Sequence, residues 1–442
     1  MRKNRTKTLM FLIGLGSLTK IFFLGCLGLS ELVVFAVAPF IFASDYKVLK
    51  SDRFMLYINL VLLSFGGMLI SSVYNNTYWI FIVKATAVYY SILSHLVVFH
   101  RLLRRDINSL GWFFIGAMIS GLITIFAFNP KVHVSSVGGF GYIGASSVDE
   151  IMEGALFWVS HVQAVLMLPI YSLYLKIPTL YPFFAVVVLI GVALKTTVSG
   201  RSAVLIALLG AVLMLLGGRT RSSMKALSRK FIPAFLIMVI SVFVFKGVYS
   251  FAAKNGYLSE GAQAKYFMQS KNGDSLLGII MGGRIEPFVG MRAAIDSPII
   301  GYGVTPVDQK NFYLDFLSKY GDLEDIKLWL KISKSAQGAI TLIPTHSHII
   351  GDWVTNGILG VLPWAYVLYL MFVYLRKYAD AIPEWFGYLA FNIAFYSWHI
   401  FFSPIGTRPN IALFVATLLI VKGVGEKRLV VNNSMSVERF YI

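Results

Sequence analysis

Continuous apolar segments of about 20 residues recur along nearly the whole chain, and they constrain its fold more than any other feature. A helix needs about 20 apolar residues to cross a bilayer, whereas an outer-membrane barrel strand alternates apolar and polar residues. Only 14% of the residues are charged, against about a quarter in a soluble domain, and the mean hydropathy is +0.72. We therefore expect an all-α, polytopic membrane protein.

Twelve segments are apolar and long enough to be spans. They are 9–26, 29–44, 54–73, 78–99, 109–128, 154–175, 179–198, 202–218, 231–250, 349–375, 384–402 and 409–423. The first two are the weakest, and they could instead be re-entrant. A basic stretch precedes segment 9–26 without a small-residue cleavage site after it, so we predict an uncleaved anchor.

Lysine and arginine predict the orientation, because cytoplasmic connections carry an excess of them. With a cytoplasmic N-terminus, more than half of the 39 Lys and Arg residues fall on the inside, and both termini are cytoplasmic. The short outside connections hold only Lys131, Arg201 and Arg408. The net charge of +18 is then mainly a topology signal facing anionic lipid head groups, and it does not indicate nucleic-acid binding.

The connection 251–345 is far longer than the others, and loops of that length are usually functional. We expect it to be one large outside, periplasmic loop. The chain then divides into nine spans in 1–250, the loop in 251–345, and three spans with a cytoplasmic tail in 346–442. Because the cytoplasmic connections are short, any chemistry belongs on the outside.

Several kinds of chemistry have no sequence support. No phosphate-binding glycine loop of the GxxxxGK[ST] type is present, so we expect no nucleotide-driven step. The single cysteine, Cys26, lies in an apolar segment, where a structural thiol is typical. Asp149, Glu150 and Glu153 could hold a divalent cation, but a solvated helix N-terminus explains them equally well. We predict neither a cofactor nor a metal site.

The first of three outside elements is Arg201, in the short turn before segment 202–218, with Lys195 about one turn earlier. A guanidinium at a helix N-terminus is suited to binding phosphate oxygens. Alternatively, Arg201 extends along the membrane surface to lipid head groups, and the residues alone favour neither reading.

The second element lies in the large loop, where Gly282 and Gly283 precede Arg284, and Arg292 follows. A glycine pair frees backbone N–H groups for an anion, and two arginines could bind two phosphates. A solvated surface carrying ordinary ion pairs is the alternative.

The third element is the run Thr345-His346-Ser347-His348 at the start of segment 349–375. Thr345 or Ser347 can cap the helix. A histidine here could act as a general base near neutral pH, with Asp352 orienting it, or both histidines could simply be interfacial. We expect Gly357 and Gly360 to let another helix pack closely, which would fix His346 in place.

Together these residues resemble the O-antigen ligase and Wzy-type polymerase superfamily. The run His346-Ser347 followed after nine residues by Gly357-x-x-Gly360 is similar to its H[NSQ]x9GxxG motif. Arg201 to Leu205 matches its Arg-x-x-x-Leu element, and Arg284 to Gly303 resembles the segment that precedes the histidine motif.

The resemblance implies a GT-C-like glycosyltransferase of the bacterial inner membrane, with a periplasmic site and no cofactor. Its donor would be a glycan on undecaprenyl pyrophosphate, with His346 as the base and Arg201 and Arg284 binding the pyrophosphate. Arg292, Lys195, His348 and Ser347 would contact substrate. The acceptor would be a second lipid-linked glycan in a polymerase or lipid A-core in a ligase, and a chain-length regulator and a flippase are expected partners. The alternative of another class is a flippase or other transporter.

Overall fold

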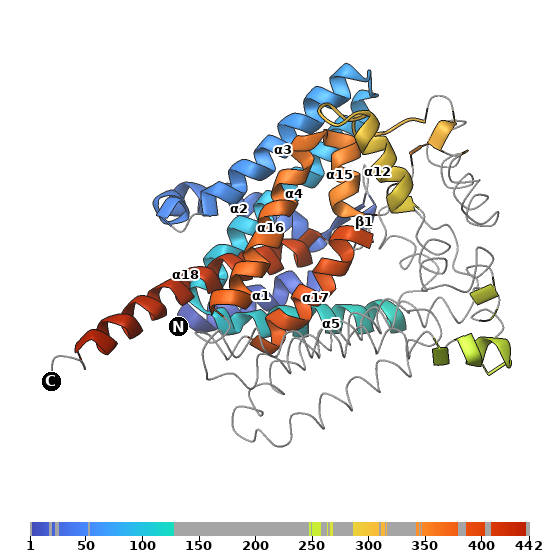
Figure 1. Cartoon of the computed structure of the whole chain (residues 1–442). Helices are drawn as coiled ribbons and strands as arrows, with labels where there is room; N and C mark the ends of the chain where they lie inside the picture. Colours follow the sequence, from blue (N-terminus) through green and yellow to red (C-terminus); the bar gives the residue numbers. More distant parts are fainter. Residues whose placement is uncertain are drawn as a thin grey trace.

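The structure is a computed structural model of the whole chain. It describes residues 2–16, 20–22, 26–51, 54–127, 286–308, 347–378, 386–402 and 408–438, with short pieces between 247 and 267, 311 and 315, and 342 and 345. This part is mostly helical, and its one short antiparallel hairpin pairs β1 (Lys20–Phe22) with β2 (Cys26–Gly28) (Figure 1). The all-α expectation is confirmed for it. Predicted segments 154–175, 179–198 and 202–218, and nearly all of 231–250, lie outside the described residues.

Three helices in the described part are long and apolar enough to cross a membrane: α2 (Leu29–Ser51), α3 (Phe54–Tyr74) and α4 (Trp79–Arg105). Large apolar side chains on α3 are exposed, including Leu63 and Ile70. An exposed apolar face on a long helix is what lipid contact requires, so these helices indicate a membrane protein.

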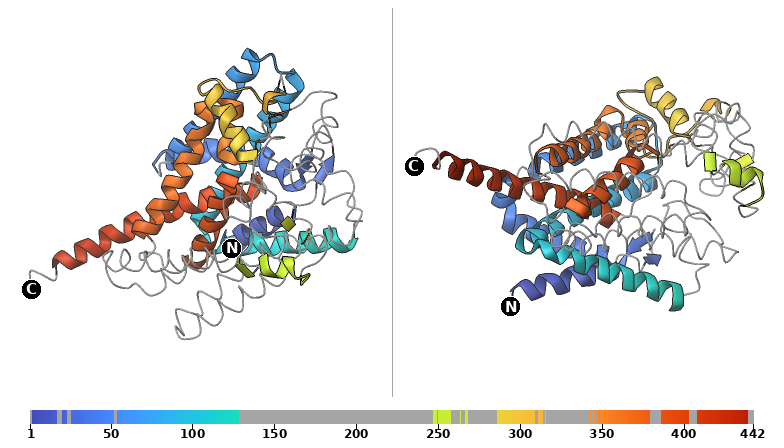
Figure 2. Two further views of the ribbon diagram at one scale, coloured as in Figure 1. Left: turned by 45° about the vertical axis from the view of Figure 1, so that its right-hand side comes forward. Right: turned by 60° about the horizontal axis from the view of Figure 1, so that its bottom comes forward.

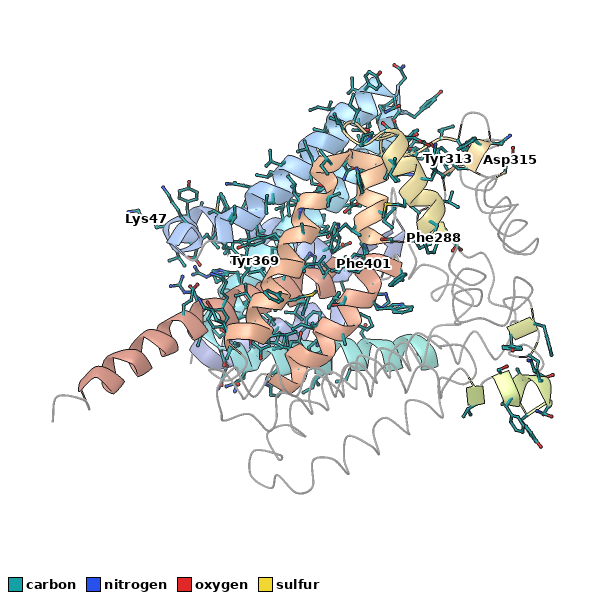
Figure 3. The ribbon with its side chains drawn as sticks, viewed as in Figure 1. Lys47, Phe288, Tyr313, Asp315, Tyr369 and Phe401 are labelled. Carbon is teal, nitrogen blue, oxygen red and sulfur yellow. The ribbon has the colours of Figure 1, made fainter. Side chains whose placement is uncertain are left out.

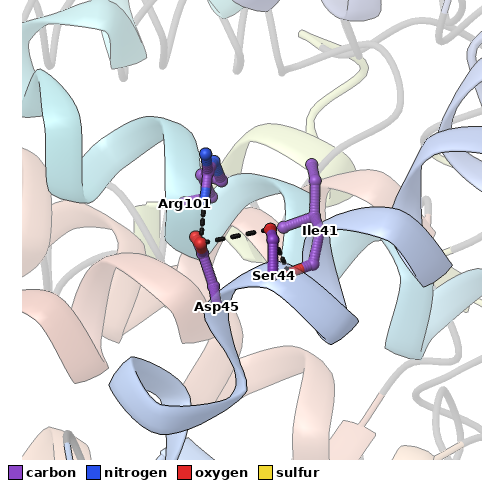
Figure 4. A network of polar contacts seen from close by, with 4 residues as sticks. All are labelled: Ile41, Ser44, Asp45 and Arg101. Atoms are coloured by element: carbon purple, nitrogen blue, oxygen red, sulfur yellow. Dashed lines mark hydrogen bonds and ion pairs between the residues drawn. The ribbon is translucent and has the colours of Figure 1, made fainter.

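Contacts between these helices give their relative directions. Near the start of α2, Glu31 accepts a hydrogen bond from Ser91 of α4 at 2.6 Å. Further along both helices Asp45 forms an ion pair with Arg101, beside Ser44 (Figure 4). The two contacts advance together along α2 and α4, so these helices run parallel. If successive spans alternate in direction across the membrane, the second and the fourth span must run parallel, as α2 and α4 do.

Two predicted segments are not single helices. Segment 9–26 is interrupted, because α1 (Arg2–Gly16) ends at Gly16 and the β hairpin follows. Segment 349–375 is divided at Gly357 into α15 (His348–Asn356) and α16 (Ile358–Val373), after which a π turn, η4 (Tyr374–Tyr378), ends the run. At Gly357 the backbone has a positive φ, which a Cβ disfavours, so glycine permits the chain to leave the helix there.

The C-terminal helices complete the apolar core. Within the described residues α17 (Phe386–Phe402) matches its predicted segment, while α18 (Arg408–Glu438) continues far past residue 423 and takes in most of the expected tail. It projects beyond the other described helices (Figure 2). Its first half is buried against α4 and α17, where Phe414 stacks on Tyr396 with ring centroids 4.3 Å apart.

Candidate functional site

The structure describes about half of the residues that the sequence analysis assigns to a site. His346, Arg201, Arg284 and Lys195 lie outside the described residues, and their predicted roles stay predictions. Arg292, Ser347, His348, Gly357 and Gly360 are described. The site is therefore built from α12 (Glu286–Asp296), the turn that follows it, and the hairpin of α15 and α16.

Two motifs about 50 residues apart in the sequence are joined by backbone hydrogen bonds. After α12 the chain turns at 297–303, and Tyr302 N donates to the Val354 carbonyl of α15 at 2.7 Å. Gly303 N donates to the Thr355 carbonyl at 3.1 Å, and the Trp353 indole donates to the Pro298 carbonyl at 2.9 Å. The large predicted loop thus contacts the histidine motif directly, and α12 lies beside α15 (Figure 1).

Gly357 makes this contact possible. Its backbone has φ +65° and ψ −162°, a conformation that is essentially restricted to glycine. A Cβ at this position would lie 1.8 Å from the Ile299 carbonyl oxygen. The sequence analysis expected a helix to pack here, whereas the structure places a turn of the large loop against it.

Gly360 lies one turn further along, in α16. A Cβ there would be 2.1 Å from the Asp352 carbonyl oxygen of α15. Gly360 therefore allows α15 and α16 to pack against each other within the hairpin. The helix that packs closely on Gly360 is α15, which comes directly before α16 in the chain.

The 297–303 turn and the residue after it also contact the end of α3 and the connection that follows α3. The Asn75 amide donates to the Gly301 carbonyl at 3.2 Å, and Val304 N donates to Ser72 Oγ at 3.1 Å. This end of α3 and α4 is opposite the end that carries Arg101, Arg104 and Arg105. The described motifs therefore gather at the end that the charge pattern predicts to be outside.

The start of α15 is held by Ser347. Its hydroxyl accepts a hydrogen bond from Ile350 N at 3.2 Å, which makes Ser347 the helix cap, and it donates to the Ile400 carbonyl of α17 at 2.8 Å. Ser347 is buried, so its hydroxyl acts in capping and in joining two helices. This geometry gives Ser347 a structural use, and the substrate contact that the resemblance implies stays a prediction.

His348 and Asp352 both contact Trp364 of α16. The imidazole stacks on the indole with ring centroids 4.9 Å apart and an angle of 25° between the rings. The indole N–H donates to Asp352 Oδ2. The sequence analysis proposed that Asp352 could orient a histidine; in the structure its carboxylate bonds to Trp364, which also stacks on His348.

Arg292 pairs within its own helix. Its guanidinium makes two contacts with Asp296, at 3.2 and 3.1 Å, and about half of the side chain is exposed. Asp296 also accepts from the Tyr313 hydroxyl at 2.9 Å, and Tyr302 lies 2.7 Å from that hydroxyl. Because Tyr313 donates to the carboxylate, Tyr302 donates to Tyr313. Arg292 thus ends a polar chain beside α12, where Figure 3 labels Tyr313.

Burial perturbs both tyrosines of this chain. It raises the pKa of Tyr313 well above its usual value, and the hydrogen bonds to Tyr302 and Asp296 raise that pKa further. Burial also raises the pKa of Tyr302. Both phenols therefore stay protonated well above neutral pH, and the chain serves to fix the 297–303 turn on α12.

A second polar group joins α15 to the long helices. The Asn356 amide donates to the Tyr89 hydroxyl of α4 at 2.7 Å and to Ser64 of α3 at 3.3 Å. The sequence analysis passed over Asn356 and Trp364. A polar group within an apolar segment needs a partner, and this signal could have found both residues.

The comparisons add no assignment of family or activity. Within the described residues, no group of three or more His, Cys, Asp or Glu side chains is arranged to hold a metal ion. No protein-family model matches the sequence, and a search of characterised proteins found no match.

Proposed function

We propose that this protein is a membrane glycosyltransferase that polymerises the repeat units of a surface polysaccharide. Its donor is a glycan on undecaprenyl pyrophosphate at the outer face of the inner membrane. The observation that supports this most is the contact between the 297–303 turn and α15, because it unites two of the three motifs on which the resemblance rests.

The proposed roles follow from the charge that develops in the reaction. Glycan transfer releases a polyprenyl pyrophosphate, whose negative charge grows in the transition state. Fixed cations aimed at that charge are among the largest catalytic contributions that a protein can make. Arg201 and Arg284 would supply them, and His346 would remove the proton from the acceptor hydroxyl.

Purified protein with a polyprenyl-pyrophosphate glycan tests this proposal. We expect His346→Ala and Arg201→Ala to reduce turnover by about 10²–10³-fold at normal folding, the usual effect of removing one such group. His348→Ala is the comparison variant: its ring packs on Trp364, so its loss should lower turnover far less than the loss of His346. Normal turnover in His346→Ala would contradict the assignment. Supplying lipid A-core as the alternative acceptor separates a ligase from a polymerase.

A lipid-linked glycan flippase is the alternative of another class. Transporters bind substrate at helices interrupted near the middle of the membrane, whereas Gly357 lies at the end of the helices that is predicted to be outside. Movement of a labelled lipid-linked glycan across vesicles, without any lengthening of the glycan, would support this alternative over the transferase.

A further inference from the structure

The short helix α15 depends on its neighbours for its position. It has nine residues, and isolated helices of that length are unstable in water. Its C-terminal end is held by the backbone bonds from Tyr302 and Gly303. Its first turn is held by side chains, namely Ser347 on α17 and the contacts of His348 and Asp352 with Trp364.

Trp364 makes most of the side-chain contacts that hold the first turn of α15. His348 and Asp352 are four residues apart, so they lie on the same side of α15, the side that faces α16. The hydrogen bond from the indole N–H to Asp352 limits rotation of the indole ring. The ring in turn supports one face of the imidazole, 4.9 Å away. The Asp352 carboxylate therefore fixes the indole ring, and the fixed indole ring in turn limits the orientation of the His348 imidazole.

Packing alone does not explain this choice of residues. A phenylalanine at 364 would stack on His348 as well, and an apolar residue at 352 would avoid placing a carboxylate among apolar helices, which is costly. The combination of Asp352 and Trp364 gives a fixed ring orientation that apolar side chains do not provide.

We infer that Asp352 and Trp364 are positioning residues that hold the His348 imidazole, and with it the first turn of α15, in a fixed orientation against α16. The inference deepens the proposed function and rests on it for its effect on catalysis. The first turn of α15 carries the histidine motif, so a loosened turn lowers turnover while the affinity for the donor is little changed.

Three variants of the full chain test this. Trp364→Phe keeps an aromatic ring but loses the N–H donor, and Asp352→Leu removes the acceptor. Asp352→Asn is the matched control, because its amide oxygen still accepts the hydrogen bond. The first readout is the rate at which diethyl pyrocarbonate modifies His348, measured by mass spectrometry. The second is kcat and KM for glycan transfer, with a melting curve for each variant.

We expect Trp364→Phe and Asp352→Leu to raise the modification rate of His348 roughly tenfold, which corresponds to about 1.4 kcal/mol. Both should lower kcat with KM unchanged, and Asp352→Asn should resemble the unmodified protein. Equal damage from Asp352→Asn and Asp352→Leu would overturn the inference, since the charge and not the hydrogen bond would then matter. Unchanged modification in both Trp364→Phe and Asp352→Leu would overturn it too.

The two readouts keep the inference separate from the proposed function. If the unmodified protein transfers no glycan, the proposed function fails, and the modification rates still decide whether Asp352 and Trp364 hold His348. If Trp364→Phe does not fold, the comparison of Asp352→Leu with Asp352→Asn decides alone.

Discussion

Replacing Gly357 with alanine tests the contact on which the described site depends. Two separate costs follow from the structure. The backbone at Gly357, with φ +65° and ψ −162°, is outside the range that other residues adopt, and holding alanine there costs on the order of 1–3 kcal/mol. The new methyl group would also lie 1.8 Å from the Ile299 carbonyl oxygen, so the 297–303 turn must move.

Displacing packed atoms in this way costs about 1–3 kcal/mol more. The sum is about 2–6 kcal/mol, a large part of the roughly 5–15 kcal/mol that stabilises a typical folded domain. With an unfolding entropy of about 2.1 cal/mol/K per residue, the Tm of a chain of 442 residues shifts by roughly 1 °C for each kcal/mol, so we expect the apparent Tm in detergent to fall by roughly 2–6 °C. The separation of the 297–303 turn from α15 should also raise hydrogen exchange at Tyr302 and Gly303, whose N–H groups bond to α15.

Gly351→Ala is the control. Gly351 lies within α15, and among the described residues a Cβ there would meet Thr345 alone, at 3.6 Å or more, which is an ordinary contact. Alanine also favours a helix by about 1 kcal/mol over glycine, so this variant should melt at or above the temperature of the unmodified protein. Equal melting temperatures for Gly357→Ala and Gly351→Ala would refute the reasoning.

Two further predictions concern the topology and the tyrosine chain. Alkaline phosphatase fused after Ser270 or Lys334 should be active, and fused after Arg221 or Lys377 inactive; activity after Arg221 would exclude the predicted orientation. Tyr313→Phe should lower stability by about 1.5–3 kcal/mol through loss of the bond to Asp296. Because the folded-state pKa of Tyr313 is raised, its contribution is complete below pH about 10 and is lost as the pH rises further. Melting curves at increasing pH should therefore fall less steeply for Tyr313→Phe, and equal slopes would contradict this.

The long helices are the part of the fold that local sequence predicts well. The ends of α3 and α17 fall within about two residues of the predicted segments 54–73 and 384–402. The reason is that a long apolar run must satisfy its own backbone groups in lipid, and a helix does so without help from the rest of the chain. The basic residues at the far end of α4 likewise predict an orientation from local charge alone.

The arrangement of the site depends on tertiary contacts that are not local. Local hydropathy predicts that 349–375 is one span. It contains no information on the contact between Gly357 and a turn more than 50 residues earlier in the chain. The sequence likewise does not reveal the partner of Asp352. It places a carboxylate near two histidines but does not show that Trp364 bonds to that carboxylate and stacks on His348. The sequence by itself determined that the described chain forms apolar helices and which residues carry polar chemistry. Only the folded hairpin of α15 and α16 decided which of those residues meet, because glycine allows a close approach but does not select the partner.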